Sequence, residues 1–492
     1  MKGAMVKKLQ VRLALMGLAL APGLAFGFNS GSTGADGAFS PTVNTVLALP
    51  ASGVFNFTTV NIPSGVTVSF KKNATNTPVV ILASGNVTIA GYLGIAGSDG
   101  APSGSGGDGT LGDDGLPGAG GPGGYNGGRG GVGNKVVGGF GLGPGGGAGG
   151  TFYSGWANPY WGGGGGSFGT VGAYSYTTNA YYSYGNSASG PTYGTSQLLP
   201  LIGGSGGGGG VGGSVFSGGG GGGGGGALLI ASSGTVNITG TINANGGIGA
   251  VSSGAGCGGG GGGGSGGAIR VVATAIQGNG TVGSSGGTGS VACAGGAGFE
   301  QGGAGGQGRI RFESESITRT AATTPAYTFG APGSVFVAGL PTLLITSVGG
   351  AAVPAEPTGN ADVTLPSTTA NPVLVTFATT GVPVGNTVQL TLKPASGTPV
   401  TVVSPALTGT TESGTASVSV SLPSGPSVLQ ATVTYTIVVA MGEALSTYAQ
   451  GERVEKITLA ATLGGKESKV ILVTVSGKEY EVPSAVLAAM PS

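Results

Sequence analysis

Histidine is absent from this chain of 492 residues, and only 7% of its residues are charged. Without histidine, Ser-His and Cys-His nucleophile systems, histidine general bases and histidine metal ligands are all excluded. The formal net charge is +1, which favours neither a nucleic-acid partner nor an anionic membrane surface. Asp and Glu are also missing from residues 115–299. An enzyme that needs paired carboxylates therefore cannot draw them from that part of the chain.

One acidic cluster precedes this gap, in SDGAPSGSGGDGTLGDDG, and it comprises Asp99, Asp108, Asp113 and Asp114. The cluster resembles a calcium-binding nonapeptide only in part, because the motif is not repeated and its spacing differs. Solvated turn residues are the favoured interpretation, with a calcium site as the alternative. We expect no catalytic residue, no metal and no cofactor.

The chain has two cysteines, Cys257 and Cys293. Two cysteines without histidine disfavour a zinc site. Both lie in glycine-rich stretches near successive strand-like segments, which favours a disulfide formed in an oxidising compartment. Two free thiols are the alternative.

Residues 1–27 have the pattern of a signal peptide. Basic residues precede the apolar run 13–20, and Ala25-Phe26-Gly27 places small residues where a signal peptidase cleaves. No later apolar run reaches the roughly 20 residues of a membrane-spanning helix. We therefore expect a secreted or cell-surface protein with no membrane span in its mature chain.

Three segments repeat one pattern, beginning at Gly226, Gly267 and Gly308, so that the starts are 41 residues apart both times. This period predicts two columns of apolar residues, one of Leu228, Ile269 and Ile310 and one of Ile230, Val271 and Phe312. The alternate residues Leu229, Arg270 and Arg311 face the other way, as in strands with one buried face. Stacked short strands of this kind predict a parallel β-solenoid.

An earlier segment, residues 78–97, fits the same columns, with Ile81, Val87 and Ile89 matching Ile230, Val236 and Ile238. On the opposite face of these strands, Arg270, Arg309 and Arg311 are expected to pair with Glu300, Glu313 or Glu315. A structural role for these pairs is favoured over a catalytic one.

The sequence GGGGSGGAIRVV at 261–272, with the apolar alternation that follows, resembles glycine-rich right-handed parallel β-helices of secreted bacterial surface proteins. The resemblance covers residues 28–312 as a pattern. It implies a β-helix domain within residues 28–320 and a location at the cell surface, and it implies no particular activity.

Glycine is the most abundant residue, and 88 of the 115 glycines lie between residues 91 and 310. A chain without Cβ atoms can form an extended helix with three residues per turn, and several such helices can hydrogen-bond side by side. Polyglycine-II-like helices of this kind are similar in composition to glycine-rich phage tail-fibre adhesins. Flexible loops are the alternative, because Gly/Ser-rich segments ordinarily behave as coils.

An aromatic-rich insertion occupies residues 151–194. Aromatic side chains with little charge around them can stack on sugar rings or bury a partner's surface. They can equally cover the glycine helices as a hydrophobic core, and this alternative stays open. The candidate binding patch comprises Tyr153, Trp156, Tyr160, Trp161, Tyr181, Tyr182 and Tyr184.

After residue 320 the composition changes to short alternating strands between Gly, Pro and Ser turns. Seven such segments, at 343–348, 361–365, 372–378, 387–392, 399–403, 416–422 and 431–439, predict an immunoglobulin-like β-sandwich over residues 341–440. Residues 441–492 carry more charge and predict a hairpin around 464–465. They form either a small charged β module or an extension of the sandwich.

The sequence therefore predicts an all-β protein: a right-handed parallel β-helix with polyglycine-II-like insertions, followed by an immunoglobulin-like sandwich. We expect a structural or adhesive protein without catalytic activity. Glycans, another surface protein or further copies of the chain are its expected partners. A polysaccharide-active lyase or hydrolase on the same scaffold is the alternative.

Overall fold

The computed structural model describes residues 27–50, 52–74, 76–102, 115–152, 161–177, 187–214, 216–252, 258–291, 300–335, 340–354, 362–463, 468–482 and 484–489. Strands dominate these residues, so the protein is all-β as predicted. Helical structure in the described part is confined to α1 (Val439–Leu445) and two 3-10 turns, η1 (Ser446–Tyr448) and η2 (Ser484–Ala489). The predicted signal peptide lies outside the described residues except for Gly27.

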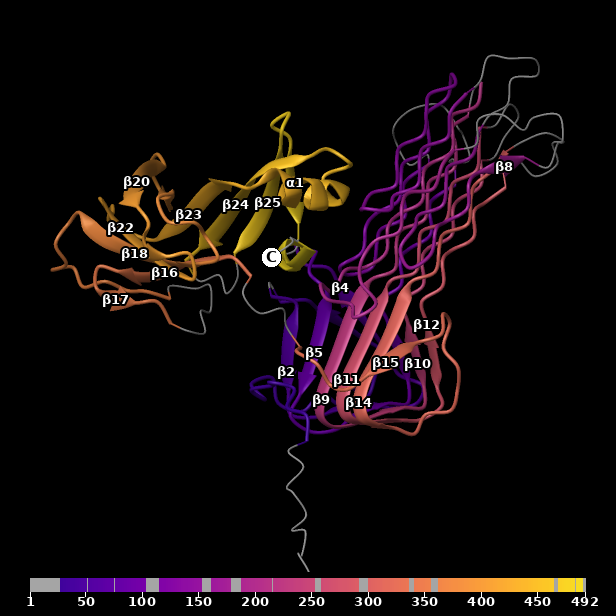
Figure 1. Cartoon of the computed structure of the whole chain (residues 1–492), viewed down its shortest axis with the longest axis horizontal. Coiled ribbons are helices and arrows are strands. Elements are labelled where there is room, and N and C mark those ends of the chain that lie inside the picture. Colours follow the sequence, from indigo (N-terminus) through magenta and orange to yellow (C-terminus); the bar gives the residue numbers. More distant parts are fainter. Residues whose placement is uncertain are drawn as a thin grey trace, which may run out of the picture.

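Two sheets of parallel strands form the N-terminal half, which we call the parallel-strand part (Figure 1). The larger sheet has the order β15-β14-β11-β9-β5-β2, with β3 beside β6 and β6 beside β9. Its strands are β2 (Val54–Phe57), β3 (Val60–Ile62), β5 (Val79–Ala83), β6 (Val87–Ile89), β9 (Ala227–Ile238), β11 (Ala268–Gln277), β14 (Arg309–Ile317) and β15 (Thr328–Gly330). The smaller sheet has the order β1 (Thr45–Ala48), β4 (Thr67–Lys71), β7 (Tyr92–Gly94), β10 (Thr241–Asn243) and β12 (Thr281–Gly283).

The register of these strands confirms both predicted columns. Ile269 of β11 lies between Leu228 and Ile310, and Val271 lies between Ile230 and Phe312. The earlier segment also aligns as predicted, because Ile81 pairs with Ile230 and Val87 with Val236. Residues that are 41 positions apart in the chain therefore lie directly opposite each other on neighbouring strands.

A hydrophobic core fills the space between the two parallel sheets. It joins column residues such as Ile230 and Val271 to Leu93, Ile242 and Val282 of the smaller sheet. At the N-terminal end, Phe39 and Phe55 both stack on Phe57, with ring centroids 5.2 and 5.5 Å away.

Part of the outer face of the larger sheet is also buried, which corrects the expectation of strands with a single buried face. Leu229 is 2% exposed and Arg270 is 1% exposed, although both point away from the inner core. The segment that carries Tyr193, Leu198 and Ile202 packs over this face together with Phe168. The period-two alternation could not show this, because the covering residues come from segments outside the repeated strands.

The C-terminal part, residues 340–489, contains two antiparallel sheets around a shared core (Figure 1). One sheet has the order β17 (Ala351–Ala352), β16 (Thr342–Val348), β18 (Val373–Thr380), β22 (Ser413–Val420) and β21 (Thr408–Thr410). The other has the order β20 (Val400–Ala406), β19 (Thr387–Pro394), β23 (Ser427–Thr436), β24 (Val454–Thr462), β25 (Lys469–Thr474) and β26 (Glu479–Val482).

Six of the seven strands expected between 341 and 440 coincide with observed strands. The exception is 361–365, whose described residues 362–365 form no strand. Val363 and Leu365 pack against the core without sheet pairing, so their alternation reflects burial alone. Residues 454–482 continue the sheet of β23, because β24 pairs with it from Gln430 to Thr436.

Candidate binding surface of the glycine bundle

The glycine-rich segments between the parallel strands lie side by side and rise away from the sheets (Figure 1). We call them the glycine bundle, residues 95–102, 115–150, 161–177, 187–191, 203–226, 244–252, 258–267, 284–291 and 301–308. A further antiparallel pair, β8 (Tyr176–Thr177) with β13 (Glu300–Gln301), joins two of these segments. Backbone hydrogen bonds link each segment to several neighbours.

Segment 203–213 shows the pattern of these bonds most clearly. The amides of Gly206, Gly209 and Gly212 donate to the oxygens of Leu142, Gly139 and Val136, in one neighbouring segment. The next amide in each triplet donates to a second neighbour, with Gly207 bonded to Gly222 and Gly210 to Gly219. The amide of Gly208 turns to a third neighbour, at Gly164. Successive residues thus bond in three directions with a period of three, as a threefold extended helix requires.

Glycine is required inside this bundle because backbone atoms of the neighbours occupy the place of a side chain. A Cβ atom added at Gly210 would lie 1.9 Å from the oxygen of Gly259, and one at Gly222 would lie 2.1 Å from that of Gly247. Real Cβ atoms do not approach other atoms so closely. The hydrogen-bonded packing favours the ordered alternative over flexible loops for the described residues.

Four buried segments form the interior of the bundle, and the other segments surround them. The interior segments are 161–168, 203–213, 217–226 and 258–267. Around them, hydrogen bonds connect 95–102, 115–121, 126–132, 136–142, 147–150, 187–190, 170–176, 301–308, 284–291 and 244–252 in that order, and the last returns to the first. The surrounding segments therefore form a closed perimeter.

Positions that point outward from the perimeter carry side chains, at the period of three that the helix imposes. Segment 244–252 exposes Ile248 and Val251, and segment 284–291 exposes Thr288 and Val291. The glycines two residues before these side chains, Gly246 and Gly249 or Gly286 and Gly289, would each place a Cβ within 2.1 Å of a neighbour's carbonyl oxygen. At these four positions a side chain is thus excluded, whereas the outward positions leave room for one.

Three perimeter segments form one continuous face, because each directly follows a strand of the smaller sheet. Segments 95–102, 244–252 and 284–291 continue β7, β10 and β12, and the register of the strands persists. Gly97 donates to Asn245 and Gly246 donates to Ser285, at 2.9 Å in both bonds. The outward positions therefore form three rows: Ala96, Asn245 and Ser285; Asp99, Ile248 and Thr288; and Pro102, Val251 and Val291. We call this array the row face.

Along each segment the rows are about 9 Å apart, since three residues rise about 3.1 Å each. Asp99 is the one ionisable residue among these nine, and its Oδ1 accepts the backbone N–H of Ile248 at 2.7 Å. The Oδ1 of Asn245 accepts the N–H of Ser285 in the same way, at 2.8 Å. Polar side chains of one segment thus cover outward amides of the next, and the face presents almost no free charge.

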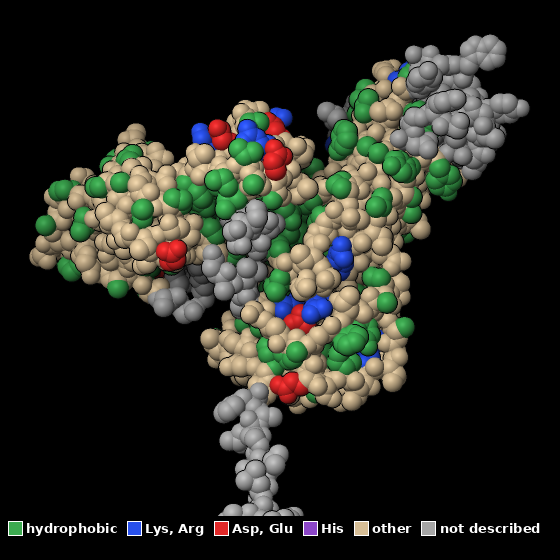
Figure 2. Space-filling model, in the orientation of Figure 1, with side chains coloured by type: hydrophobic (Ala, Val, Ile, Leu, Met, Phe, Trp, Pro, Cys, Tyr) green, Lys and Arg blue, Asp and Glu red, His purple; other side chains and the backbone are tan. Residues whose placement is uncertain are grey.

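Other perimeter segments are also apolar outside. Val137 and Phe140 are 51% and 67% exposed, and Val171 and Tyr174 are 59% and 56% exposed, each pair again three residues apart. Figure 2 shows apolar patches along the bundle, whereas charged side chains gather mainly on the C-terminal part. This period-three spacing is readable in the sequence, and reasoning from glycine content alone missed it.

Most of the predicted aromatic patch lies outside the described residues, namely Tyr153, Trp156, Tyr160, Tyr181, Tyr182 and Tyr184. Trp161 is described, and its side chain is 1% exposed. Its backbone oxygen accepts the N–H of Val211 in the bundle interior. Trp161 therefore cannot contact a surface ligand in this conformation, which corrects that part of the expectation and fits the packing alternative. Both cysteines, Cys257 and Cys293, also lie outside the described residues, as do Asp108, Asp113 and Asp114.

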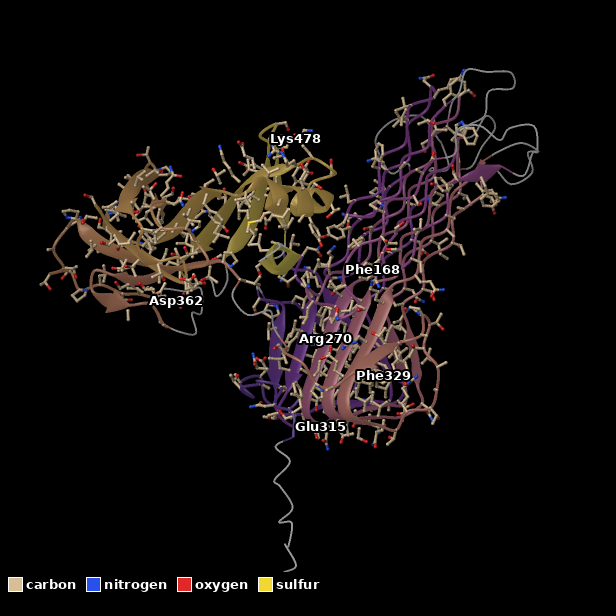
Figure 3. All side chains as sticks on the ribbon, viewed as in Figure 1. Phe168, Arg270, Glu315, Phe329, Asp362 and Lys478 are labelled. Carbon is tan, nitrogen blue, oxygen red and sulfur yellow. The ribbon has the colours of Figure 1, made fainter. Side chains whose placement is uncertain are left out.

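Phe168 lies at the foot of the bundle, where it meets the sheets (Figure 3), and Tyr193 contacts it there. The rings of Tyr193 and Phe168 pack at a tilt of 43° with centroids 4.7 Å apart, and the Tyr193 hydroxyl donates to the oxygen of Gly203. Burial raises the pKa of Tyr193, and also that of Tyr125, and nearby Tyr448 of the C-terminal part adds to both shifts. Burial lowers the pKa of Lys72 to about 8, while its Nζ donates to the oxygen of Gly124.

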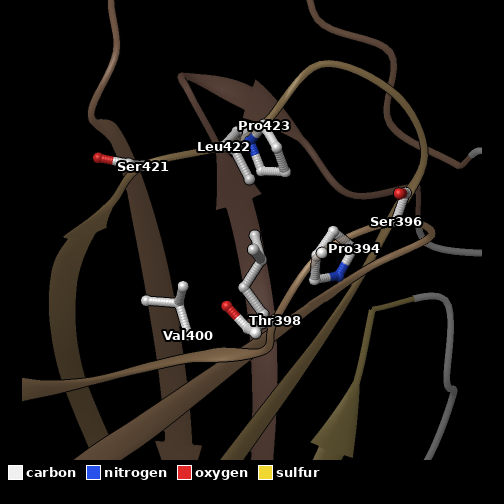
Figure 4. Close-up of a pocket in the computed structure, with 9 residues that line it drawn as sticks. Pro394, Ser396, Thr398, Val400, Ser421, Leu422 and Pro423 are labelled. Atoms are coloured by element: carbon white, nitrogen blue, oxygen red, sulfur yellow. The ribbon is translucent and has the colours of Figure 1, made fainter.

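The C-terminal part contains a separate open hollow of about 320 Å³ (Figure 4). Its lining is mostly apolar and includes no ionisable side chain: Leu392, Pro394, Ser396, Gly397, Thr398, Val400, Ser421, Leu422 and Pro423. The hollow therefore offers no acid or base for catalysis.

Comparison with family models, with curated proteins and with solved structures found no match for this chain. Among the described residues, no three Cys, Asp or Glu side chains gather as metal ligands would. The same residues include no helix with the length and apolarity that a membrane span requires.

Proposed function

We propose that this is a secreted or cell-surface structural or adhesive protein without catalytic activity, which binds its target through the outside of the glycine bundle. In this proposal residues 1–27 are a signal peptide. The parallel-strand part is a right-handed β-helix with polyglycine-II insertions, and the C-terminal part is an immunoglobulin-like sandwich that spaces or anchors it. The parallel register, the period-three hydrogen bonds and the paired antiparallel sheets support these assignments.

The row face is the observation that carries the binding proposal. A chain that only needed a compact bundle could place small polar residues at every outward position, yet Ile248, Val251 and Val291 are 47%, 41% and 44% exposed. Exposed apolar groups arranged with polar ones on a rigid support are typical of binding surfaces.

A neutral glycan is the partner that suits this face best. The row face carries no basic group that would attract an acidic polymer. Asn245, Ser285 and Thr288 can exchange hydrogen bonds with sugar hydroxyls, while Ile248 and Val251 can pack on the apolar faces of sugar rings. A rigid face also loses little conformational entropy on binding.

Binding to immobilised neutral and acidic polysaccharides tests the proposal. We expect wild-type protein to bind neutral polymers, and Ile248→Asp with Val251→Asp to weaken that binding at least tenfold. The matched control is Val43→Asp, because Val43 is 68% exposed and lies outside the bundle. Equal binding by the double variant and wild type would remove the row face from the proposal, and turnover of any polysaccharide would favour the enzyme alternative.

Replacing Tyr174 and Tyr176 by Ser tests the aromatic side of the bundle separately. Both side chains are exposed, and the hydroxyl of Tyr176 bonds to Gln301. Loss of binding in this variant alone would move the site from the row face to the aromatic insertion.

A further inference from the structure

A buried ionic cluster lies on the outer face of the larger sheet, in β11 and β14, away from the glycine bundle (Figure 3). Glu313 Oε2 lies 2.8 Å from Nη2 of Arg270, and Glu313 Oε1 lies 2.6 Å from Nε of Arg311. The side chains of Arg270 and Glu313 are 1% and 3% exposed. The sequence predicted pairing among these residues, and the structure selects Glu313 as the shared acceptor.

Arg309 was also expected to pair with a glutamate, but its Nη2 donates to the oxygen of Tyr193 at 3.4 Å. Its guanidinium lies 5.7 Å from the ring centroid of Phe168, at the foot of the bundle. The cluster is therefore limited to three side chains, and the geometry around each of them is defined.

The chain that leaves the parallel-strand part covers this cluster. After β15, the N–H of Gly333 donates to Glu313 Oε2 at 2.9 Å. Arg270 Nη2 donates to the oxygen of Ser334 at 2.8 Å, and Nη1 reaches the oxygen of Val335 at 3.4 Å. Glu313 and Arg270 thus bind backbone groups of three consecutive residues, Gly333 to Val335, in the segment that leads to the C-terminal part.

Besides the two ion pairs, Glu313 and Arg270 form hydrogen bonds with the backbone of residues 333–335. Burial by itself raises the pKa of Glu313, but hydrogen bonds from Arg270 and Arg311 and from the Gly333 amide outweigh it and leave that pKa below its usual value. Buried charges are tolerated when each is paired and hydrogen-bonded, and removing one partner leaves the others uncompensated.

We infer that Arg270, Glu313 and Arg311 form a latch that fixes residues 333–335 to the sheet, so that the C-terminal part is held in place instead of moving on a flexible tether. The composition of this segment, APGSV from 331 to 335, would otherwise suit a mobile linker. The latch makes the joint rigid by binding the backbone groups of Gly333, Ser334 and Val335, and the side chain of Val335 also packs against the neighbouring hydrophobic core. The inference does not depend on the binding proposal.

Hydrogen exchange and limited proteolysis of the full chain test the latch. In Glu313→Gln we expect exchange of the amides in 328–335 to accelerate at least tenfold, and a broad-specificity protease to cleave near 331–335 while the glycine bundle stays protected. Glu315→Gln is the matched control, because Glu315 lies exposed on the same strand. It should behave as wild type.

A second variant keeps the inference testable if Glu313→Gln does not fold. Gly333→Pro changes none of the three charged residues, but it replaces the N–H that donates to Glu313 with a ring carbon that displaces the carboxylate. We expect cleavage near 331–335 to accelerate several-fold in this variant. Wild-type protection of 328–335 in the variants that fold would overturn the latch. Because the cluster is buried, adding salt to wild type should not release the segment, and release by salt would also contradict it.

Discussion

The glycine bundle and the strand-rich parts of this protein are held together by different interactions. In the parallel-strand part, apolar side chains such as Ile230 and Val271 fill the space between sheets. In the bundle, neighbouring backbones approach so closely that no side chain fits at interior glycines such as Gly210 and Gly222, and backbone hydrogen bonds provide most of the contacts. A substitution that removes side-chain atoms therefore destabilises the parallel-strand part, whereas a substitution that adds atoms destabilises the bundle.

The largest expected effect comes from adding one methyl group inside the bundle. Gly210→Ala should destabilise the bundle by roughly 3 kcal/mol or more, because the surrounding atoms are backbone that cannot move aside. This destabilisation is measured as faster amide hydrogen exchange across residues 203–226 and as a lower melting temperature.

Gly283→Ala is the matched control for this change. Its added Cβ would meet only the side chain of Asn245, at 3.4 Å, which is ordinary contact. Equal tolerance of alanine at 210 and 283 would contradict the backbone-packed interior.

An intermediate effect is expected when atoms are removed from the column core. Val271→Ala should lower the free energy of unfolding by about 2 to 4 kcal/mol through lost burial and a residual cavity, since Val271 is fully buried. Denaturant unfolding measures it, and Val46→Ala, at an exposed position in β1, should cost less than about 0.5 kcal/mol. If Val271→Ala lowered the free energy of unfolding no more than Val46→Ala does, the column residues would not be what stabilises the parallel-strand part.

The smallest expected effect concerns Lys72, at the junction of the two regions. Its pKa is about 8 in the folded protein and 10.5 when unperturbed, so the unfolded chain binds more protons between these values. Stability should therefore rise with pH from about 8 towards 10, by about 1 to 2 kcal/mol after allowance for screening.

The difference between wild type and Lys72→Met, measured by unfolding between pH 7 and 9.5, isolates this contribution. Above that range, tyrosines ionise in the unfolded chain while buried Tyr125 and Tyr193 stay protonated in the folded protein, because their pKa values are raised. This difference lowers the stability as the pH rises and opposes the contribution of Lys72. Lys71→Met is the control at the exposed neighbour. A flat difference curve would mean that Lys72 is solvated in the folded protein.

Several features of the fold could be predicted because they are periodic in the chain. The spacing of 41 residues placed Leu228, Ile269 and Ile310 in one column, and the observed register has them there. Glycine runs indicated side-chain-free segments that hydrogen-bond between neighbours. The candidate site was less predictable. Trp161, for which the sequence left a binding role and a packing role open, is buried, and the sequence could not decide because tryptophan is suited to both.

Local pattern and composition alone determined the all-β class, the column residues and the positions where glycine alternates with a side chain every third residue. These depend on the pleat of a strand and the threefold turn of an extended helix, both of which are properties of adjacent residues. Only the tertiary structure decided which segments neighbour one another, which side chains form the row face, and that Glu313 is shared by Arg270 and Arg311 beneath Gly333. Most such contacts join residues tens to hundreds of positions apart, and in the bundle the backbone bonds that select them are chemically identical at every glycine.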